Sequence, residues 1–216
     1  MAAVLENLPL LLEGLRTTLQ LAVGALVVAL VLGVVVGVLR VSPLLPARAV
    51  GTVYVEFVRN TPLLVQLFFW IFGLPFIGIL LPEFGGALLG LGIYTSAFVA
   101  ESVRAGLLSI SRTQIEAARS LGLTYLQTMR LVLLPQALAI TVPPIGNCSI
   151  ALTKNTSVAS AVLVTELMYQ AEVVNGRTFA TYETFFVTGL FYLALTLPLS
   201  RLVALTETRL ARYRSA

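Results

Sequence analysis

The residues of this chain best suited to bind a small solute form a short polar run inside an apolar stretch. Lys154 opens the run and is followed by Asn155, Thr156 and Ser157. A cation beside amide and hydroxyl groups can hold a carboxylate group. Asn147, seven residues earlier, falls on nearly the same face of a helix. This stripe predicts a polar pathway for a solute; the alternative is that Lys154 only extends its charge to a nearby aqueous surface.

Two further pairs of charged residues lie within apolar stretches, each pair three residues apart. Glu56 precedes Arg59, and Glu101 precedes Arg104. Side chains with this spacing are neighbours on one helix face and can neutralise each other. Charges in apolar segments also mark solute pathways. Each pair therefore has two interpretations, a structural ion pair or part of the pathway.

Catalytic chemistry has few candidate residues in this chain. The sequence contains no histidine, no aspartate and no Gly-Lys-Ser/Thr loop that could cradle nucleotide phosphates. The single cysteine, Cys148, can form neither an internal disulfide nor a cysteine-based metal site. These absences disfavour an intramembrane enzyme, and we expect that the chain itself is no enzyme and carries no cofactor of its own.

The composition is typical of a membrane protein. Hydrophobic residues make up 58% of the chain and charged residues 11%, and the mean hydropathy is +0.95. A soluble protein needs more charged residues to cover its surface. The net charge of +4 comes from basic residues dispersed between apolar segments. This distribution argues against a nucleic-acid partner and for contact with membrane lipid.

Five apolar segments are long enough to cross a bilayer as helices, which need about 20 residues. Pro143 and Pro144 predict a kink in the fourth of them. We find no repeat and no second domain, so we expect one all-α transmembrane domain over residues 1–216. The expected spans are 17–39, 49–70, 85–108, 136–159 and 184–205.

The charged segment between the third and fourth spans predicts two short helices joined by a sharp bend. Thr113 with Glu116, and Thr124 with Gln127, have the spacing of helix-start signals whose side chains satisfy unpaired amide groups. Gly122 lies between them and is the residue type best able to adopt the left-handed conformation that ends a helix. We expect a compact, rigid element that can transmit force.

This segment, about residues 113–135, resembles the EAA loop of ABC importer permeases. Pro135 closes it, and we expect the second short helix to give way to the fourth span there. In that family the loop docks on a cytoplasmic ATPase subunit. Val132 is a departure, because the family usually has Ile at that position. The resemblance assigns coupling to the ATPase to Glu116, Ala117, Ala118, Gly122 and Pro135.

Further motifs resemble one branch of the family, the permeases for polar amino acids. The segment 55–66 is similar to the second-span motif of that branch, with Asn60 where Gly is usual. The resemblance implies the type I ABC importer permease fold, with five transmembrane helices over about residues 14–205. It also implies a set of candidate residues for the substrate pathway. These are Glu56, Arg59, Asn60, Thr61, Gln66, Glu101, Asn147, Lys154, Asn155, Thr156 and Ser157.

The resemblance implies partners and a mechanism as well. Such permeases pair with an identical or related permease, carry two ATPase subunits that bind ATP and Mg, and receive substrate from an extracytoplasmic solute-binding protein. ATP-driven closure of the ATPase pair then opens the permease outward, and hydrolysis reopens it inward. We expect a small polar amino acid as the substrate. The alternatives are an importer of another small solute, such as methionine or an osmolyte, and a stand-alone secondary transporter or channel.

Basic residues predict the orientation of the chain in the cytoplasmic membrane. With the loop 113–135 inside, ten of the 14 basic residues fall in cytoplasmic segments, as the positive-inside rule requires. Five spans then place the N-terminus outside and the C-terminus in the cytoplasm. The ten are Arg40, Arg48, Arg104, Arg112, Arg119, Arg130, Arg201, Arg209, Arg212 and Arg214, whereas Arg16 and Arg177 fall outside.

Overall fold

The computed structural model describes residue 4 and residues 6–211. Arg212 and Arg214, which the orientation argument uses, lie outside the described residues. The described part is helical and contains no strand, so the prediction of an all-α protein is confirmed. The α-helices are α2 (Leu8–Arg40), α3 (Leu45–Asn60), α4 (Leu63–Phe68), α5 (Glu83–Leu108), α6 (Arg112–Ser120), α7 (Tyr125–Thr128), α8 (Leu134–Asn155), α9 (Leu167–Thr178) and α10 (Thr181–Ala211). The π-helical turns are η1 (Phe69–Gly73) and η3 (Met129–Leu133), and the 3-10 helices are η2 (Leu74–Ile77) and η4 (Thr156–Val162).

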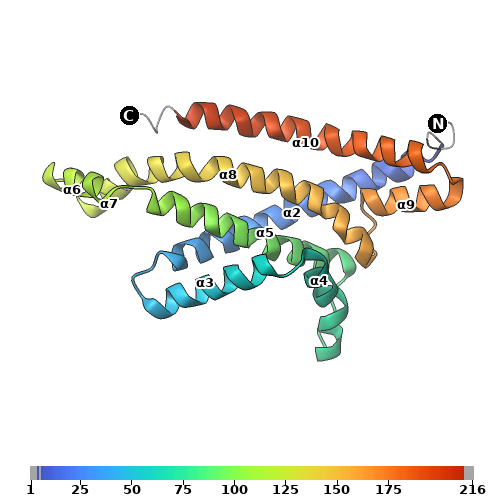
Figure 1. The fold of residues 1–216 in the computed structure, drawn as a ribbon, viewed down its shortest axis with the longest axis horizontal. Coiled ribbons are helices and arrows are strands. Elements are labelled where there is room, and N and C mark those ends of the chain that lie inside the picture. Colours follow the sequence, from blue (N-terminus) through green and yellow to red (C-terminus); the bar gives the residue numbers. More distant parts are fainter. Residues whose placement is uncertain (1–3, 5, 212–216) are drawn as a thin grey trace.

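The long helices α2, α5, α8 and α10 run along the long axis of the molecule (Figure 1). α5 contacts both α2 and α8, and α10 packs on α8. α6 and α7 lie at the same end of the molecule as the end of α10, whereas α2 begins at the opposite end, beside α9. The two short helices of the predicted loop and the start of the chain are therefore separated by the full length of the bundle.

α5 is the centre of the bundle because its neighbours approach it closely. A Cβ atom added to Gly33 of α2 would lie 2.6 Å from the side chain of Val99 in α5. A Cβ atom added to Gly106 of α5 would lie 1.9 Å from Oγ1 of Thr141 in α8. Membrane helices associate mainly through such close van der Waals packing. Glycine at these two points therefore sets the distances between the three helices.

Four helical stretches are long and apolar enough to cross a membrane. They are Leu8–Arg40, Glu83–Leu108, Leu126–Val162 and Thr181–Leu210. The pair Leu45–Asn60 and Leu63–Ile77 supplies a fifth span if it is counted as one. The predicted number of spans agrees with this upper count.

The second span differs from the single helix that we expected over 49–70. α3 ends at Asn60, and the chain turns by 104° into Leu63–Ile77. Pro62 lacks an N–H group and disfavours helical backbone in the residue before it, and Thr61 is indeed extended, with φ −100° and ψ 131°. The prediction of one helix over this span is wrong because Pro62 breaks it.

Gln66 stabilises this bend from inside. Its side chain is buried, and its Nε2 donates hydrogen bonds to the carbonyl oxygens of Val58 at 2.8 Å and Thr61 at 3.1 Å. The last carbonyl groups of a helix have no partner within the helix. Gln66 therefore satisfies acceptors that the break at Pro62 leaves open.

The fourth span also differs from its predicted bounds. α8 ends at Asn155, and the chain continues as a 3-10 helix to Val162, so the expectation of one α-helix over 136–159 is wrong in its last turn. The hydroxyl group of Thr156 donates to the carbonyl of Thr153, and that of Ser157 to the carbonyl of Lys154. These side-chain bonds occupy carbonyl groups at the end of the α-helix and favour the tighter turn.

A buried carboxylate joins three helices at the end of the bundle that holds α9. Glu166 has no exposed surface. It accepts hydrogen bonds from the hydroxyl groups of Thr18 at 3.2 Å and Tyr192 at 2.9 Å, and from the backbone N–H of Tyr169 at 2.9 Å. The last bond caps the start of α9. Glu166 therefore ties α2, α9 and α10 together.

Replacing Glu166 by alanine is expected to destabilise the protein. Tyr192 and Tyr169 would each keep a partly buried donor without its present acceptor, at a cost of up to about 1–3 kcal/mol per group. Thermal unfolding in detergent should show a lower Tm for Glu166→Ala than for Glu172→Ala, a matched change at an exposed position of α9. Equal Tm values for the two variants would contradict the role given to Glu166.

The same carboxyl group is expected to make stability depend on pH. Burial is the main cause that raises the pKa of Glu166 above its usual value of 4.5. A folded-state pKa above the unfolded one means that the folded protein binds more protons, so this stabilisation is present at low pH and is lost as pH rises through the folded-state pKa. The Tm of the wild type relative to Glu166→Gln should therefore fall with rising pH, whereas a constant difference would exclude this linkage.

Candidate functional site

The loop between α5 and α8 has the bend that its sequence predicts. α6 ends in a left-handed residue, Gly122, with φ +75°. The N–H of Gly122 donates to the carbonyl of Arg119 at 2.9 Å, and that of Leu123 to the carbonyl of Ala118 at 3.1 Å. These two bonds form a Schellman motif, in which only glycine adopts the central conformation without strain. The prediction that the first short helix ends at Gly122 is confirmed.

Of the two predicted helix-start signals, only the second is formed. The N–H of Thr124 donates to Oε1 of Gln127 at 2.9 Å, and the N–H of Gln127 donates to Oγ1 of Thr124 at 3.4 Å. The signal at Thr113 and Glu116 is wrong, because α6 already begins at Arg112 and Thr113 lies inside its first turn. Ser111 occupies the cap position without a side-chain hydrogen bond.

Pro135 does not separate the second short helix from the fourth span. The helical backbone runs from α7 through the π-helical turn η3 into α8, whose first turn contains Pro135. Proline has no N–H group to donate, so it fits the first turn of a helix. The expectation of a break here is wrong, and the loop is continuous with α8.

The loop presents an exposed surface of mixed character at the end of the molecule. Glu116 and Ala117 are exposed, whereas Ala118 is buried. Two leucines are almost fully exposed, Leu121 at 81% and Leu126 at 74%. Exposed large apolar side chains beside small and charged ones are typical of an interaction surface.

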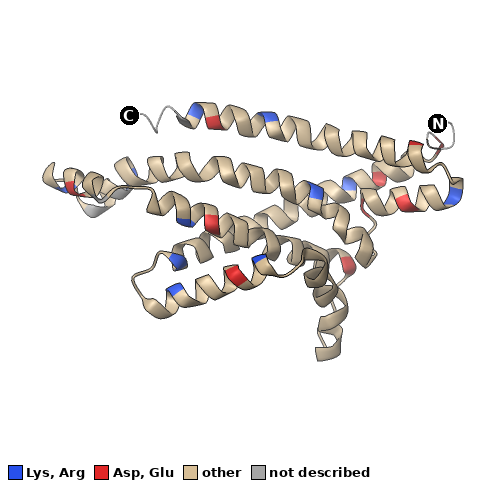
Figure 2. Ribbon diagram, in the orientation of Figure 1, with Lys and Arg blue, Asp and Glu red and all other residues tan. Residues whose placement is uncertain are grey.

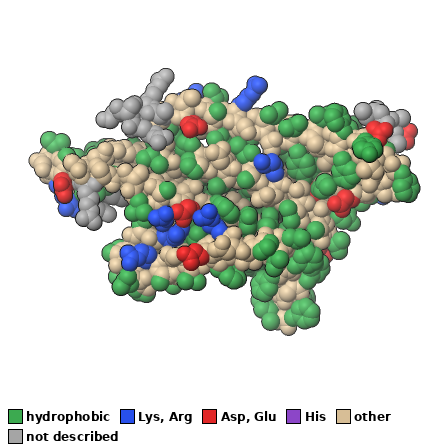
Figure 3. Space-filling view, viewed as in Figure 1, with side chains coloured by type: hydrophobic (Ala, Val, Ile, Leu, Met, Phe, Trp, Pro, Cys, Tyr) green, Lys and Arg blue, Asp and Glu red, His purple; other side chains and the backbone are tan. Residues whose placement is uncertain are grey.

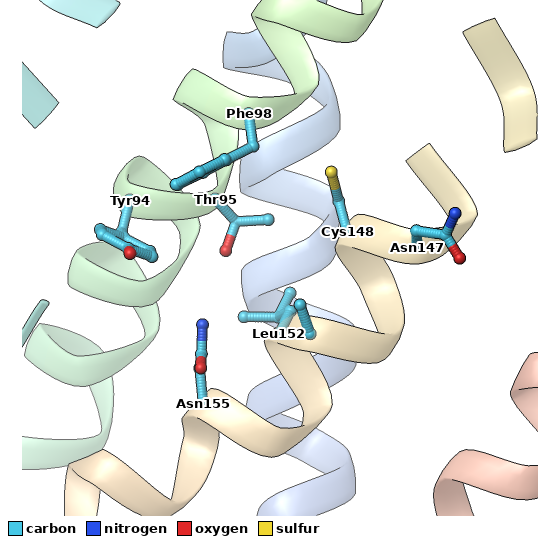
Figure 4. Close-up of a pocket in the computed structure, with 8 residues that line it drawn as sticks. Tyr94, Thr95, Phe98, Asn147, Cys148, Leu152 and Asn155 are labelled. Carbon is cyan, nitrogen blue, oxygen red and sulfur yellow. The ribbon is translucent and has the colours of Figure 1, made fainter. Parts of the chain in front are cut away.

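The second candidate site is a groove between α5 and α8 that contains two cavities. The upper cavity, of about 350 Å³, lies toward α9 and is lined by residues that include Tyr94, Thr95 and Asn155 (Figure 4). The lower cavity, of about 590 Å³, includes Arg59 and Glu207 in its lining. Both cavities share Phe98, Asn147 and Cys148 as lining residues. Together they form a polar and aromatic path along the bundle.

The structure brings four of the predicted pathway residues to this groove. They are Arg59, Glu101, Asn147 and Asn155. The other predicted residues line neither of these two cavities. Asn60 and Thr61 donate to carbonyls of their own helix, Gln66 stabilises the bend, and Thr156 is buried. Glu56, Lys154 and Ser157 also lie off both linings.

The two predicted ion pairs have different outcomes. Glu101 accepts from Nε of Arg104 at 3.1 Å and also contacts Arg40 of α2. Arg59 does not pair with Glu56 among the described residues; its guanidinium lies over the ring of Phe98, 5.2 Å from the centroid. Figure 3 shows the resulting group of basic and acidic side chains on the face formed by α3 and α5.

Apart from Glu101, sequence reasoning missed the residues that α5 contributes to the groove. Tyr94, Thr95, Phe98 and Ser102 line the two cavities, and Tyr94 and Phe98 contact each other with ring centroids 5.2 Å apart. Their spacing of three and four residues places them on one helix face. This spacing was the feature of the sequence that could have predicted their common face. Among the described residues there is no group of three His, Cys, Asp or Glu that could hold a metal ion.

Comparison with known proteins identifies the family. The family model described as "Binding-protein-dependent transport system inner membrane component" matches residues 29–212. The chain belongs to this family. The permease is 45% identical to the probable glutamine ABC transporter permease protein GlnM of Bacillus subtilis, with 96% of each chain covered. It is 38% identical to the probable amino-acid ABC transporter permease protein PatM of Vibrio harveyi, over 96% of this chain and 94% of that one.

Solved structures support this family assignment. A crystal structure of an amino acid ABC transporter with histidines matches with a TM-score of 0.89 and 34% identity, over 96% of the permease and 97% of that chain. The MetNI methionine ABC transporter in an inward-facing conformation shares the fold, with a TM-score of 0.71 at 24% identity. The protein is thus an inner-membrane ABC transporter permease of the type I importer fold, and its family works with an ATPase and a binding protein.

The ion pairs of Glu101 lead to a testable prediction. The side chain of Arg40 is only 12% exposed, so Glu101→Gln leaves a largely buried cation without its counter-charge, at a cost of about 1–3 kcal/mol. Thermal unfolding in detergent should show that Arg40→Met combined with Glu101→Gln costs less than the sum of the single changes. Glu56→Gln, at an exposed position, is the control and should leave Tm nearly unchanged. Purely additive effects would show that the pair does not couple α2 to α5.

Proposed function

We propose that the permease translocates polar amino acids across the cytoplasmic membrane as part of an ATP-driven importer. The observation that carries this proposal is the groove between α5 and α8, where Arg59, Asn147 and Asn155 lie with aromatic side chains along one path. A concave site with a few convergent polar groups suits a small polar ligand. The relatives named for glutamine and for amino acids support the same substrate class.

Coupling to the ATPase is proposed to occur through the loop of α6 and α7. Glu116, Ala117 and Ala118 lie on α6, Gly122 ends it, and Pro135 lies in the first turn of the helix that follows. Because the loop runs without a break into α8, a push on it is passed directly to the helix that carries Asn147 and Asn155. Exposed Leu121 and Leu126 would supply apolar contacts to the ATPase surface.

The orientation and assembly follow from the same arrangement. α6, α7 and the end of α10 lie at one end of the bundle, which would face the cytoplasm. Figure 2 shows basic residues at this end, and the sequence makes them arginines. The N-terminus would then be extracytoplasmic. Two ATPase subunits with ATP and Mg, a second permease and a solute-binding protein would complete the importer. The permease itself is expected to hydrolyse nothing.

Reconstitution tests this function against the alternatives. Proteoliposomes that contain the permease with its ATPase and binding protein should accumulate labelled L-glutamine only when ATP is supplied. Uptake of methionine or of an osmolyte instead would favour another importer of the same mechanism. Uptake by the permease alone, without the ATPase, would show a secondary transporter or a channel and overturn the proposal.

Gly122 provides the test of coupling. No described atom of the permease outside the adjoining residues lies within 4 Å of a Cβ at this position. Within the permease a substitution therefore acts through the left-handed backbone, which costs a non-glycine residue about 1–2 kcal/mol. We expect Gly122→Val to lower ATP-driven uptake roughly ten-fold, with membrane abundance unchanged. Gly122→Asn is the matched control, because asparagine tolerates this conformation better and should retain more uptake. If Gly122→Val took up substrate at the wild-type rate, the bend at Gly122 would not be required for coupling.

A further inference from the structure

The upper cavity has an uncharged lining, mostly apolar with a few polar groups, that suits one kind of side chain. None of the eight described residues that line it carries a formal charge. Its volume of about 350 Å³ falls at the lower end of the roughly 300–1,000 Å³ of small-molecule sites. A charged group would have to leave water for this cavity without a counter-charge, which is unfavourable.

Two polar groups in this cavity are without a partner among the described residues. Thr95 is only 4% exposed, yet its hydroxyl group donates to no described acceptor. Figure 4 shows this hydroxyl and the amide of Asn155 pointing into the space between α5 and α8 from opposite sides. The amide of Asn155 has no hydrogen bond to a described residue either. The side chain of Thr95 is buried, whereas that of Asn155 is half-buried. A polar group that is shielded from water gains stability from a hydrogen-bond partner, and a ligand in this cavity could supply one to each residue.

We propose that the upper cavity selects amino acids with an uncharged polar side chain, and that Thr95 and Asn155 are the residues that bind that side chain. This inference rests on the proposed function. A threonine hydroxyl and an asparagine amide each supply both a donor and an acceptor. A carboxamide side chain also carries both a donor and an acceptor, so it can form hydrogen bonds with Thr95 and Asn155 at the same time.

The charged residues near the groove support this selectivity. A cationic side chain needs an unpaired carboxylate in the upper cavity. Glu101 is already contacted by Arg40 and Arg104, and Glu207 lines only the lower cavity. An anionic side chain would need a cation in the upper cavity, but Lys154 does not line it. The upper cavity therefore offers neither a carboxylate for a cationic substrate side chain nor a cation for an anionic one.

Arg59 completes the site by binding the part that all amino acids share. It lines the lower cavity, and its guanidinium lies 5.2 Å from the ring centroid of Phe98, a residue that both cavities share. A guanidinium group is well suited to hold a carboxylate. The α-carboxylate would lie at the junction of the cavities near Arg59, with the side chain directed toward Asn155.

A binding experiment without the solute-binding protein tests the site itself. The purified permease–ATPase complex would be titrated with labelled L-glutamine, with L-arginine and L-glutamate as competitors. The wild type should prefer glutamine, and Thr95→Val and Asn155→Leu should each weaken glutamine binding roughly 3- to 10-fold, as expected for one lost hydrogen bond. Asn155→Asp should improve binding of arginine relative to glutamine, a gain that misfolding does not produce.

The controls separate this inference from the function on which it rests. Asn175→Leu repeats the asparagine change on α9, outside both cavities, and should leave the binding unchanged. If the wild type binds none of the three amino acids, the proposed function itself fails. If it binds amino acids but does not prefer glutamine, or if Asn155→Asp leaves the order of preference unchanged, the selectivity assigned to Thr95 and Asn155 is wrong.

Discussion

The close approach of α5 to α2 and α8 is the contact on which the rest of the structure depends. In a bilayer the surrounding lipid is as apolar as the helices, so packing and not water exclusion holds them together. Gly33 and Gly106 leave room for the side chains of Val99 and Thr141, and a methyl group at either glycine would collide with them. This distance also sets the width of the groove, because α5 and α8 form its two walls.

Four polar residues inside the bundle illustrate two different roles. Glu166 and Gln66 have their hydrogen bonds satisfied and connect helices or stabilise a bend. Thr95 and Asn155 have no described partner and face a cavity. Desolvation is costly for a polar group without a partner. Glu166 and Gln66 therefore have a structural role, whereas Thr95 and Asn155 are placed to bind a ligand.

The sequence predicted those features that depend on local chemistry. The apolar spans, the left-handed Gly122 and the helix start at Thr124 and Gln127 require only neighbouring residues, and the structure contains them. The burial of Glu166 depends on Thr18 and Tyr192, which are distant in the chain. The lining of the groove likewise depends on how α5 faces α8. Local patterns also failed at three points. Pro62 breaks the second span although it lies in an apolar run, Thr113 and Glu116 form no helix start, and Pro135 does not end a helix.

α8 has a mechanical property that follows from its length. It begins directly after the loop and ends at Asn155, 22 residues on, so at 1.5 Å per residue it forms an arm of about 33 Å. Tilting such an arm by roughly 10° about the end that joins the loop sweeps its tip through about 6 Å. A small rotation at one membrane surface is thereby magnified into a displacement as wide as a side chain near the other.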